Sequence, residues 1–397
     1  MAESKSRSVD RYVKQYSKTL STNADSNPNK TKSNVELEFR FGSRNGLNKM
    51  KFENVFKTLL MYGFKQVDET HNLRILFNEK MNEFISQNFG EKVNLRCDMS
   101  DLKVIQDYCK TNQLPEDLSE IEFCIKNKDP DFLMDNINID YLFKSSIMRE
   151  NILDLDNPII IKTVERFQNM KKMFRYINRI RLKHDDFPLF VDFSIVKSHT
   201  NKDGKLVTTT SIKKTSLFNN QENYEIEIEM DTQEKVNKNI EKSIVQLKKV
   251  IRYILSGIQN SPYPISKPES ESILEEYFKI FNIDFPDKET KKSKYFIGPS
   301  SYTLQKSNIS NDEDDPNVVD IKKDFCVTDK ADGVRKLLFI SQTGKVYLIT
   351  MNLEIQYTNL VVDNSDLFEC VIDGEHITQN KFGEQINICL LYTSDAA

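Results

Sequence analysis

The sequence predicts an α+β protein in which a domain rich in antiparallel strands is followed by part of a second, differently folded domain. Between residues 35 and 230, short segments alternate apolar and polar residues, which is the period of a strand with one buried face. Apolar residues then recur at helical spacing over residues 233–255. Two proline-containing stretches come after this helical pattern. A second group of alternating segments begins after them.

Each element follows from its own local pattern, taken in chain order. Helical spacing at residues 8–20 leads into a polar connector at 21–34. Strands are expected at 35–41, 121–126, 145–149, 174–182, 190–197, 205–213 and 224–230, with helices at 52–62 and 102–109. After the helix at 233–255, we expect a short helix at 269–281 and strands at 325–329, 334–341, 345–350 and 370–372. The expected parts are therefore 1–34, a helix and connector; 35–260, the strand-rich domain; 261–294, a linker with a short helix; and 295–397, the beginning of a second domain.

The composition favours a globular protein that contacts nucleic acid only locally. Its 397 residues are 38% hydrophobic, and the formal net charge is −4, which excludes nucleic-acid binding through overall basic charge. No apolar run approaches the roughly 20 residues of a membrane helix, and the N-terminus is polar, so we expect neither membrane insertion nor secretion. Six scattered cysteines and four separated histidines indicate neither a disulfide framework nor a zinc site.

Two predicted strands carry rows of glutamates. In residues 35–41 the period of two places Glu36 and Glu38 on one face together with Arg40, and residues 224–230 place three glutamates on one face, namely Glu225, Glu227 and Glu229. A solvated polar side explains either strand alone. Two such rows are harder to explain this way, because glutamate is a poor strand former and like charges along one face repel.

Other strands supply cations that could face these carboxylates. Basic residues line or end them: Arg96, Lys126, Arg149, Arg175, Arg179, Arg181 and Lys183. If the strands close on themselves, acidic rows face basic rows across an interior. Such an interior suits a polyphosphate, because carboxylate oxygens bind Mg²⁺ or Mn²⁺ and cations bind phosphate oxygens. A carboxylate could then orient or deprotonate a water for in-line attack on a phosphoryl group.

Glu-Leu-Glu on an early strand and Glu-Ile-Glu-Ile-Glu on a late one resemble the signature strands of the triphosphate tunnel metalloenzymes, specifically the metal-dependent RNA triphosphatases of fungal and large-DNA-virus capping systems. The resemblance spans roughly residues 35–230 and implies an eight-stranded antiparallel β tunnel with flanking helices. It implies a metal at Glu36, Glu38, Glu227 and Glu229, with Glu38 and Glu227 as catalytic residues; which glutamate activates the water stays open. The implied triphosphate contacts are Arg96, Lys126, Arg149, Arg179, Arg181 and Asp192, the last beside Ser194. Phe190 departs from the family, which often has a basic residue there, so we expect Lys197 or Lys213 to contribute instead.

A second motif, Lys-x-Asp-Gly-x-Arg, follows an apolar run at residues 325–327. It comprises Lys330, Asp332, Gly333 and Arg335. A tight Asp-Gly turn with solvated flanking charges is the simplest alternative interpretation. A lysine at a strand end can instead attack the α-phosphate of a nucleotide once its amine loses a proton. Forty residues later an Asp-Gly-Glu sequence ends in Glu375, which is suited to a metal or a ribose hydroxyl.

These two motifs resemble the first and third motifs of the covalent nucleotidyltransferases, which comprise capping guanylyltransferases and polynucleotide ligases. The resemblance implies that Lys330 is the nucleophile and forms a lysyl-nucleotide from GTP, with Asp332, Gly333, Arg335 and Glu375 at the nucleotide. The later motifs of that family and its oligonucleotide-binding domain have no room before residue 397. We therefore expect a truncated second domain and an incomplete guanylyltransferase.

A triphosphatase followed by a lysyl nucleotidyltransferase is the order of the first two capping reactions, and this fusion resembles the capping enzymes of large nucleocytoplasmic DNA viruses. The implied partners are the 5′ end of nascent RNA, GTP and a methyltransferase domain or subunit, with no membrane and no DNA. The implied location is the cytoplasm of an infected cell or the virion. A polynucleotide ligase or other adenylyltransferase is the first alternative. An inorganic triphosphatase or NTPase and a non-catalytic polyphosphate-binding subunit are the others.

Overall fold

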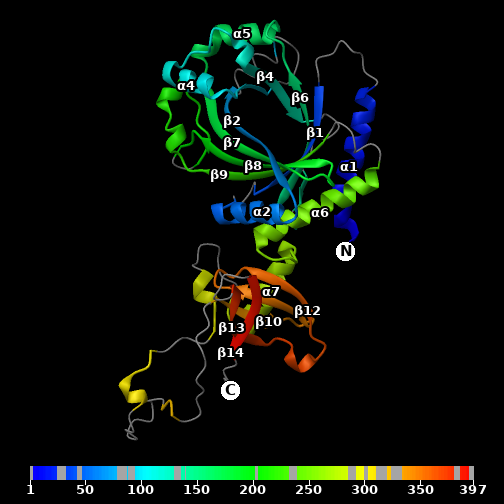
Figure 1. The fold of residues 1–397 in the computed structure, drawn as a ribbon, viewed down its shortest axis with the longest axis vertical. Helices are drawn as coiled ribbons and strands as arrows, with labels where there is room; N and C mark the ends of the chain where they lie inside the picture. The colour runs from blue at the N-terminus through cyan, green and yellow to red at the C-terminus, as the bar shows by residue number, and fades with distance from the viewer. Residues whose placement is uncertain are drawn as a thin grey trace. The chain divides into compact units, whose positions relative to one another are not determined.

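The computed structural model divides into two compact units, Met1–Pro262 and Tyr263–Ala397, which are described separately (Figure 1). The structure describes residues 3–24, 33–42, 47–77, 87, 94–128, 136–138, 140–201, 204–231, 239–284, 292–298, 303–309, 320–322, 333–379 and 385–392. None of the helices within these ranges combines the length and the apolar character needed to span a membrane.

Unit 1 is built around a closed antiparallel barrel of eight strands. In order around the barrel these are β1 (Ser33–Phe41), β9 (Asn223–Met230), β8 (Leu189–Ser198), β7 (Lys172–Lys183), β2 (Lys65–Phe77), β3 (Leu95–Met99), β4 (Ile121–Lys128) and β6 (Phe143–Ile152). β6 pairs back onto β1 over its full length and so closes the barrel, and the short β5 (Asn136–Asn138) pairs with β6. The predicted eight-stranded tunnel is confirmed.

Helices cover the barrel on two sides (Figure 1). The first group is α1 (Glu3–Ala24), α2 (Lys49–Met61) and α6 (Ile240–Gln259); the second is α4 (Leu102–Thr111) and α5 (Pro158–Arg166). α2 begins at its N-cap Asn48, whose side chain accepts a hydrogen bond from the Lys51 amide. Its apolar face packs against α6, where Gly257 lies so close to Val55 that a Cβ would approach the Val55 Cα to 2.6 Å.

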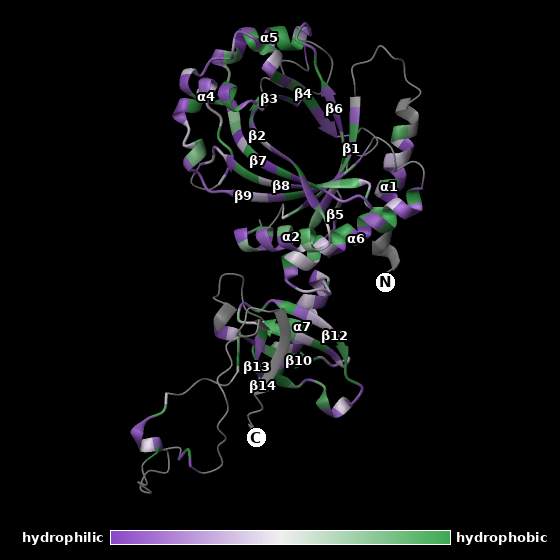
Figure 2. Cartoon of the chain, viewed as in Figure 1, coloured by the Kyte–Doolittle hydropathy of each residue, from purple (hydrophilic) through white to green (hydrophobic). Residues whose placement is uncertain are grey.

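Barrel strands alternate hydrophilic and hydrophobic residues, as Figure 2 shows by colour. The apolar side chains point outward into two cores, one beneath α1, α2 and α6 and the other beneath α4 and α5. Leu37 and Phe39 of β1 are fully buried in the first core. Because successive residues of a strand point to opposite faces, the polar residues between them are directed into the lumen.

Some predicted elements differ from those observed. Residues 205–213 form no strand but a loop, which makes isolated bridges from Thr209 to Lys172 and from Leu206 to Thr200 before a short 3₁₀ helix. The long helix begins at Ile240, and residues 232–238 lie outside the described part of the chain. The sequence patterns did not predict β2, β3 or α5. Short 3₁₀ helices lie at Leu118–Glu120, Phe167–Asn169, Ile212–Lys214, Leu217–Asn219, Lys292–Tyr295, Lys306–Asn308 and Ser365–Leu367.

Unit 2 contains a five-stranded antiparallel sheet and the helix α7 (Lys267–Ile280). The strand order is β12 (Ile355–Val361), β11 (Lys345–Thr350), β10 (Val334–Ile340), β13 (Val371–Gln379) and β14 (Gln385–Tyr392). Tyr277 and Phe278 of α7 pack against Leu337 and Phe339 of β10, so the helix expected within a linker contributes to the core of this unit. The strand expected at 325–329 lies outside the described residues.

Candidate functional site

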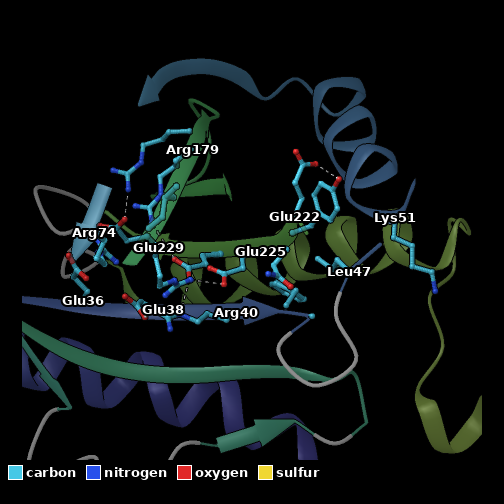
Figure 3. Close-up of a pocket in the computed structure, with 18 of the residues that line it drawn as sticks. Glu36, Glu38, Arg40, Leu47, Lys51, Arg74, Arg179, Glu222, Glu225 and Glu229 are labelled. Carbon is cyan, nitrogen blue, oxygen red and sulfur yellow. Dashed lines mark hydrogen bonds and ion pairs between the residues drawn. The ribbon is translucent and has the colours of Figure 1, made fainter. Parts of the chain in front are cut away.

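The lumen of the barrel is a charged cavity with a volume of about 1100 Å³ (Figure 3). Seven carboxylates line it: Glu36, Glu38, Glu150, Glu222, Glu225, Glu227 and Glu229. Nine cations line it as well: Arg40, Lys49, Lys51, Arg74, Arg96, Lys126, Arg175, Arg179 and Arg181. Acidic and basic rows therefore face a common space, with a small excess of positive charge.

Strands β1 and β9 place their carboxylates side by side. Glu38 lies directly opposite Glu229, and Arg40 lies opposite Glu227. Arg40 pairs with both strands, because its Nε lies 2.8 Å from Glu227 Oε1 and its Nη2 lies 2.8 Å from Glu38 Oε2. Glu38 is only 4% exposed, so its charge is screened little by solvent.

Lys126 of β4 joins three carboxylates. Its Nζ lies 2.9 Å from Glu36 Oε2, 2.5 Å from Glu38 Oε1 and 2.7 Å from Glu150 Oε1. Arg96 extends this network, with Nη2 3.0 Å from Glu150. Glu150 was not singled out from the sequence. It shares the Lys126 ammonium group with both predicted glutamates of β1.

The opposite wall, formed by β7 and β8, holds two arginines. Arg181 donates two hydrogen bonds of 2.7 Å to the two oxygens of Asp192 and one of 2.5 Å to Glu229. Arg179 donates from Nε to Ser194 and lies 3.3 Å from Asp192. Asp192 is 1% exposed and holds both guanidinium groups, so it orients the arginines rather than meeting an anion itself.

Burial and neighbouring charges shift the pKa values of the lumenal carboxylates in different directions. Burial raises the pKa of Glu36 to about 7, although Lys126 opposes the shift. Burial also raises the pKa of Glu229 against the attraction of Arg181. Burial disfavours the charge on Glu38 and Glu150 too, but their cationic neighbours outweigh it: Arg40 and Lys126 lower the pKa of Glu38, and Lys126 and Arg96 lower that of Glu150 to about 2.

The donor set suits a hard divalent cation. Within the described residues, no three Asp, Glu, His or Cys side chains are already arranged as metal ligands, and Lys126 Nζ lies where oxygens of Glu36, Glu38 and Glu150 converge. Glu38 Oε2 is nevertheless buried without a well-directed hydrogen bond, although Arg40 pairs with it electrostatically. It lies beside Glu229, whose pKa is raised. Carboxylate oxygens are the donors that Mg²⁺ and Mn²⁺ prefer, so the residue types of this wall fit either ion.

Most predicted tunnel residues lie on the cavity wall: Glu36, Glu38, Glu227, Glu229, Arg96, Lys126, Arg179 and Arg181. The prediction of a lumenal position is wrong for three basic residues. Arg149 lies opposite outward-facing Val35 in the ladder, and alternation therefore places it on the outer face. Lys197 donates to the Phe218 carbonyl outside the barrel, and Lys213 lies exposed in a 3₁₀ helix.

Lys197 and Lys213 were expected to supply the positive charge that Phe190 does not provide. The structure shows instead that Phe190 contacts two cations of the neighbouring strand. The Phe190 ring lies 4.8 Å from the Arg181 guanidinium carbon and 4.6 Å from Lys183 Nζ, which are cation–π distances. The wall also contains Arg74 and Glu150, which the sequence patterns did not single out, and Arg40, Arg175 and Glu225, which strand alternation had placed on the charged faces. Arg74 is bidentate to Asp98, and Arg175 pairs with Glu225 at 2.9 Å.

In unit 2, Lys330 and Asp332 lie outside the described residues. Arg335 lies opposite Glu375 in the β10–β13 ladder and is bidentate to Asp373, with Nε–Oδ1 and Nη2–Oδ2 distances of 3.0 and 2.7 Å. A Cβ at Gly333 would lie 2.7 Å from the His376 carbonyl oxygen, so only glycine fits this approach. Glu375 Oε2 is buried and accepts no hydrogen bond from the described residues.

The chain is similar in sequence to the protein named "Probable mRNA-capping enzyme" of Acanthamoeba polyphaga mimivirus, with 28% identity over 155 residues. The match covers 39% of this chain and 11% of the length of that relative. It confirms the predicted resemblance to capping enzymes of large DNA viruses. No protein-family model matches the chain.

Among solved structures, the chain is similar to a monoclinic form of the mimivirus capping enzyme triphosphatase, with a TM-score of 0.39 and 15% identity, over 64% of this chain and 99% of that one. It is also similar to the S. pombe Pct1 RNA triphosphatase, with a TM-score of 0.31 and 10% identity, over 62% and 90% of the two chains.

Proposed function

We propose that unit 1 is a metal-dependent RNA 5′-triphosphatase, which removes the γ-phosphate from 5′-triphosphate RNA. The observation that carries this proposal is the enclosed lumen in which the glutamates of β1 and β9 face the arginines of β7. A triphosphate needs many cationic contacts, and its hydrolysis needs charge neutralisation together with a positioned water. The sequence similarity to a capping enzyme supports RNA as the substrate.

The cations of the lumen would bind and orient the triphosphate. Arg179 and Arg181 project from one strand, two residues apart, and Asp192 fixes their guanidinium planes. Arg40 and Lys126 approach from the β1 side, where they now neutralise glutamates. Binding of a polyanion would therefore exchange carboxylate partners for phosphate oxygens, and the carboxylates released in this way would be available to a divalent cation.

Hydrolysis requires a water in line with the bond between the γ-phosphorus and the β–γ bridging oxygen. One of the lumenal glutamates would orient this water and accept its proton. The bridging bond then breaks, which leaves orthophosphate and diphosphate-ended RNA. A divalent cation held by Glu36, Glu38 and Glu229, with Glu227 beside Arg40, would neutralise charge on the transferred phosphoryl group when bound.

We also propose that unit 2 is part of a nucleotidyltransferase in which Lys330 accepts GMP from GTP. The supporting observation is that Gly333 and Arg335 at the start of β10 lie beside Glu375 of β13, one buried oxygen of which accepts no hydrogen bond from the described residues. Incubation with α-labelled GTP or ATP tests the assignment: label that resists denaturation and is absent from Lys330→Ala supports it. Label from ATP alone would indicate an adenylyltransferase, and no label would oppose both.

For the intact protein we propose capping of nascent viral transcripts, with a methyltransferase domain or subunit completing the cap, in the cytoplasm of an infected cell or in the virion. The match to the mimivirus relative covers 11% of the length of that protein.

The triphosphatase proposal is tested by product analysis. Purified protein with Mn²⁺ is given γ-labelled triphosphate RNA, GTP or tripolyphosphate, and the released phosphate and the RNA end are identified. The proposal requires orthophosphate and diphosphate-ended RNA, with a higher kcat/KM for RNA than for the free compounds. Hydrolysis of GTP or tripolyphosphate alone would instead indicate a small-molecule phosphohydrolase. Binding without release by either the wild type or Glu38→Ala would indicate a non-catalytic polyphosphate-binding protein.

A further inference from the structure

The lumenal cavity extends past the arginines to an end with a different lining. There the wall is formed by Leu47, Asn48, Lys49 and Lys51 around the start of α2 and by Gln221 to Tyr224 around the start of β9. Leu47 and Tyr224 are joined by an isolated bridge, which holds the two segments together. Figure 3 shows Lys51 and Leu47 at one end of the drawn residues and Glu36 at the other.

Two lysines of α2, Lys49 and Lys51, line this end of the cavity. Lys49 and Lys51 lie in the first turn of α2, which contains no acidic residue, although positive charge there is opposed by the helix dipole. The pair of Lys49 with Glu53 is 3.8 Å long, and both side chains are at least half exposed, so solvent screens it strongly. The exposed pair of Lys49 with Glu53 therefore contributes little to the stability of α2.

The carboxylates around the same rim already have cationic partners. Glu222 accepts a hydrogen bond of 2.7 Å from Tyr224 and lies 3.6 Å from Lys197, while Glu225 lies 2.9 Å from Arg175. With Arg175, the two lysines give this end of the lining three cations against the two carboxylates Glu222 and Glu225. At the opposite end, the described lining cations pair with carboxylates inside the barrel.

We propose that this rim is the entrance for RNA, and that Lys49 and Lys51 contact the phosphodiester backbone of the first nucleotides behind the 5′-triphosphate. The inference rests on the proposed triphosphatase function. A triphosphate held by Arg179 and Arg181 would leave its RNA chain leading outward past these lysines. Single-stranded RNA carries one negative charge per nucleotide, and lysines are suited to such contacts because they act as point charges without base selectivity. The two lysines would distinguish RNA from free triphosphates.

The test is binding of single-stranded triphosphate RNA, labelled at its 3′ end, to the full chain without metal, measured by fluorescence anisotropy over a series of NaCl concentrations. The Lys49→Gln/Lys51→Gln variant is expected to raise Kd roughly tenfold at low salt. It is also expected to reduce the slope of log Kd against log salt by about 1.4, or about 0.7 for each phosphate that a lysine no longer neutralises. Lys57→Gln, on the same helix but outside the cavity lining, is the matched control and should change neither quantity.

Competition by tripolyphosphate separates the entrance from the phosphate site. Its inhibition constant should be unchanged in the double variant, because the lysines lie beyond the triphosphate. Three results would each overturn the proposal. These are an equal weakening of RNA binding and of tripolyphosphate binding in the double variant, an unchanged Kd for RNA in the double variant, or an equal rise of the Kd for RNA in Lys57→Gln. RNA binding that depends on the lysines, without phosphate release, would support the RNA entrance and refute the triphosphatase. Phosphate release together with RNA binding that does not depend on the lysines would support the triphosphatase and refute the entrance.

Discussion

Glu36 and Glu150 share the ammonium group of Lys126 but should respond oppositely to the same isosteric change. Burial raises the pKa of Glu36 from 4.5 to about 7, whereas Lys126 and Arg96 overcome burial and lower that of Glu150 to about 2. In the metal-free protein at pH 8, we expect Glu36→Gln to stabilise unit 1 and Glu150→Gln to destabilise it. Both side chains are well shielded, at 17% and 15% exposure.

The sign and size follow from proton linkage. A carboxyl with a raised pKa holds its proton more tightly in the folded state, so Glu36 lowers stability progressively as the pH rises from 4.5 to about 7. A carboxyl with a lowered pKa adds stability above 4.5 that is lost as the pH falls to about 2, which is the case for Glu150. Each shift of about 2.5 units corresponds to about 3 kcal/mol at pH 8.

The assay is urea unfolding at pH 8 and at pH 5, followed by far-ultraviolet circular dichroism after metal removal with EDTA. At pH 8 the Glu36→Gln midpoint should rise and the Glu150→Gln midpoint should fall, with m-values unchanged. At pH 5 the gain from Glu36→Gln should shrink to below about 1 kcal/mol. Midpoints that move in the same direction at pH 8 would refute the reasoning, as would a pH-independent gain.

Three further substitutions test separate parts of the structure. Arg181→Lys should lower kcat/KM for triphosphate RNA by roughly a hundredfold, since an ammonium cannot reproduce the bidentate bond to Asp192. The circular dichroism spectrum should change little. Activity near that of wild type would contradict the role given to this arginine. Lys126→Met should destabilise the metal-free protein by about 3–5 kcal/mol, because three carboxylates lose their cation. For the same reason, Mn²⁺ should raise the melting temperature of this variant more than that of wild type. Equal effects of Mn²⁺ on the two melting temperatures in differential scanning calorimetry would oppose a metal site here. Gly257→Ala should lower the melting temperature through a clash with α2, whereas Val245→Ala, exposed on the same helix, should not; equal melting temperatures would refute the close packing.

The sequence was sufficient to predict the two glutamate strands and their lumenal faces. β1 and β9 alternate strictly, and their apolar residues are long enough to fill a core, so period alone assigned the faces. The same rule could have corrected Arg149. It immediately precedes Glu150, and only one of two successive residues can face the lumen.

Other elements gave no comparable signal. The first half of β2, from Lys65 to Thr70, is exposed and largely polar, and only pairing with β7 makes it a strand. β3 has five residues, too few for a clear period, although it carries Arg96. Residues 205–213 alternate like a strand but form a loop, because local alternation does not guarantee a partner with free hydrogen-bonding groups.

The ion-pair network could not be deduced from the sequence, because it depends on register between strands far apart in the chain. Lys126 meets Glu36 and Glu38 across 90 and 88 residues. Nothing local to either segment specifies that β6 lies between β4 and β1 and brings Glu150 to the same ammonium group. Closure of the barrel sets this geometry.

The central claim is that the lumenal glutamates support metal-dependent removal of the γ-phosphate. The most direct measurement is phosphate release from γ-labelled triphosphate RNA across a Mn²⁺ titration, comparing wild type, Glu38→Gln and the exposed control Glu116→Gln. We expect release by wild type and Glu116→Gln to rise and saturate with Mn²⁺, and release by folded Glu38→Gln to stay at background. Wild-type release that does not depend on metal, or full activity of Glu38→Gln, would contradict the account.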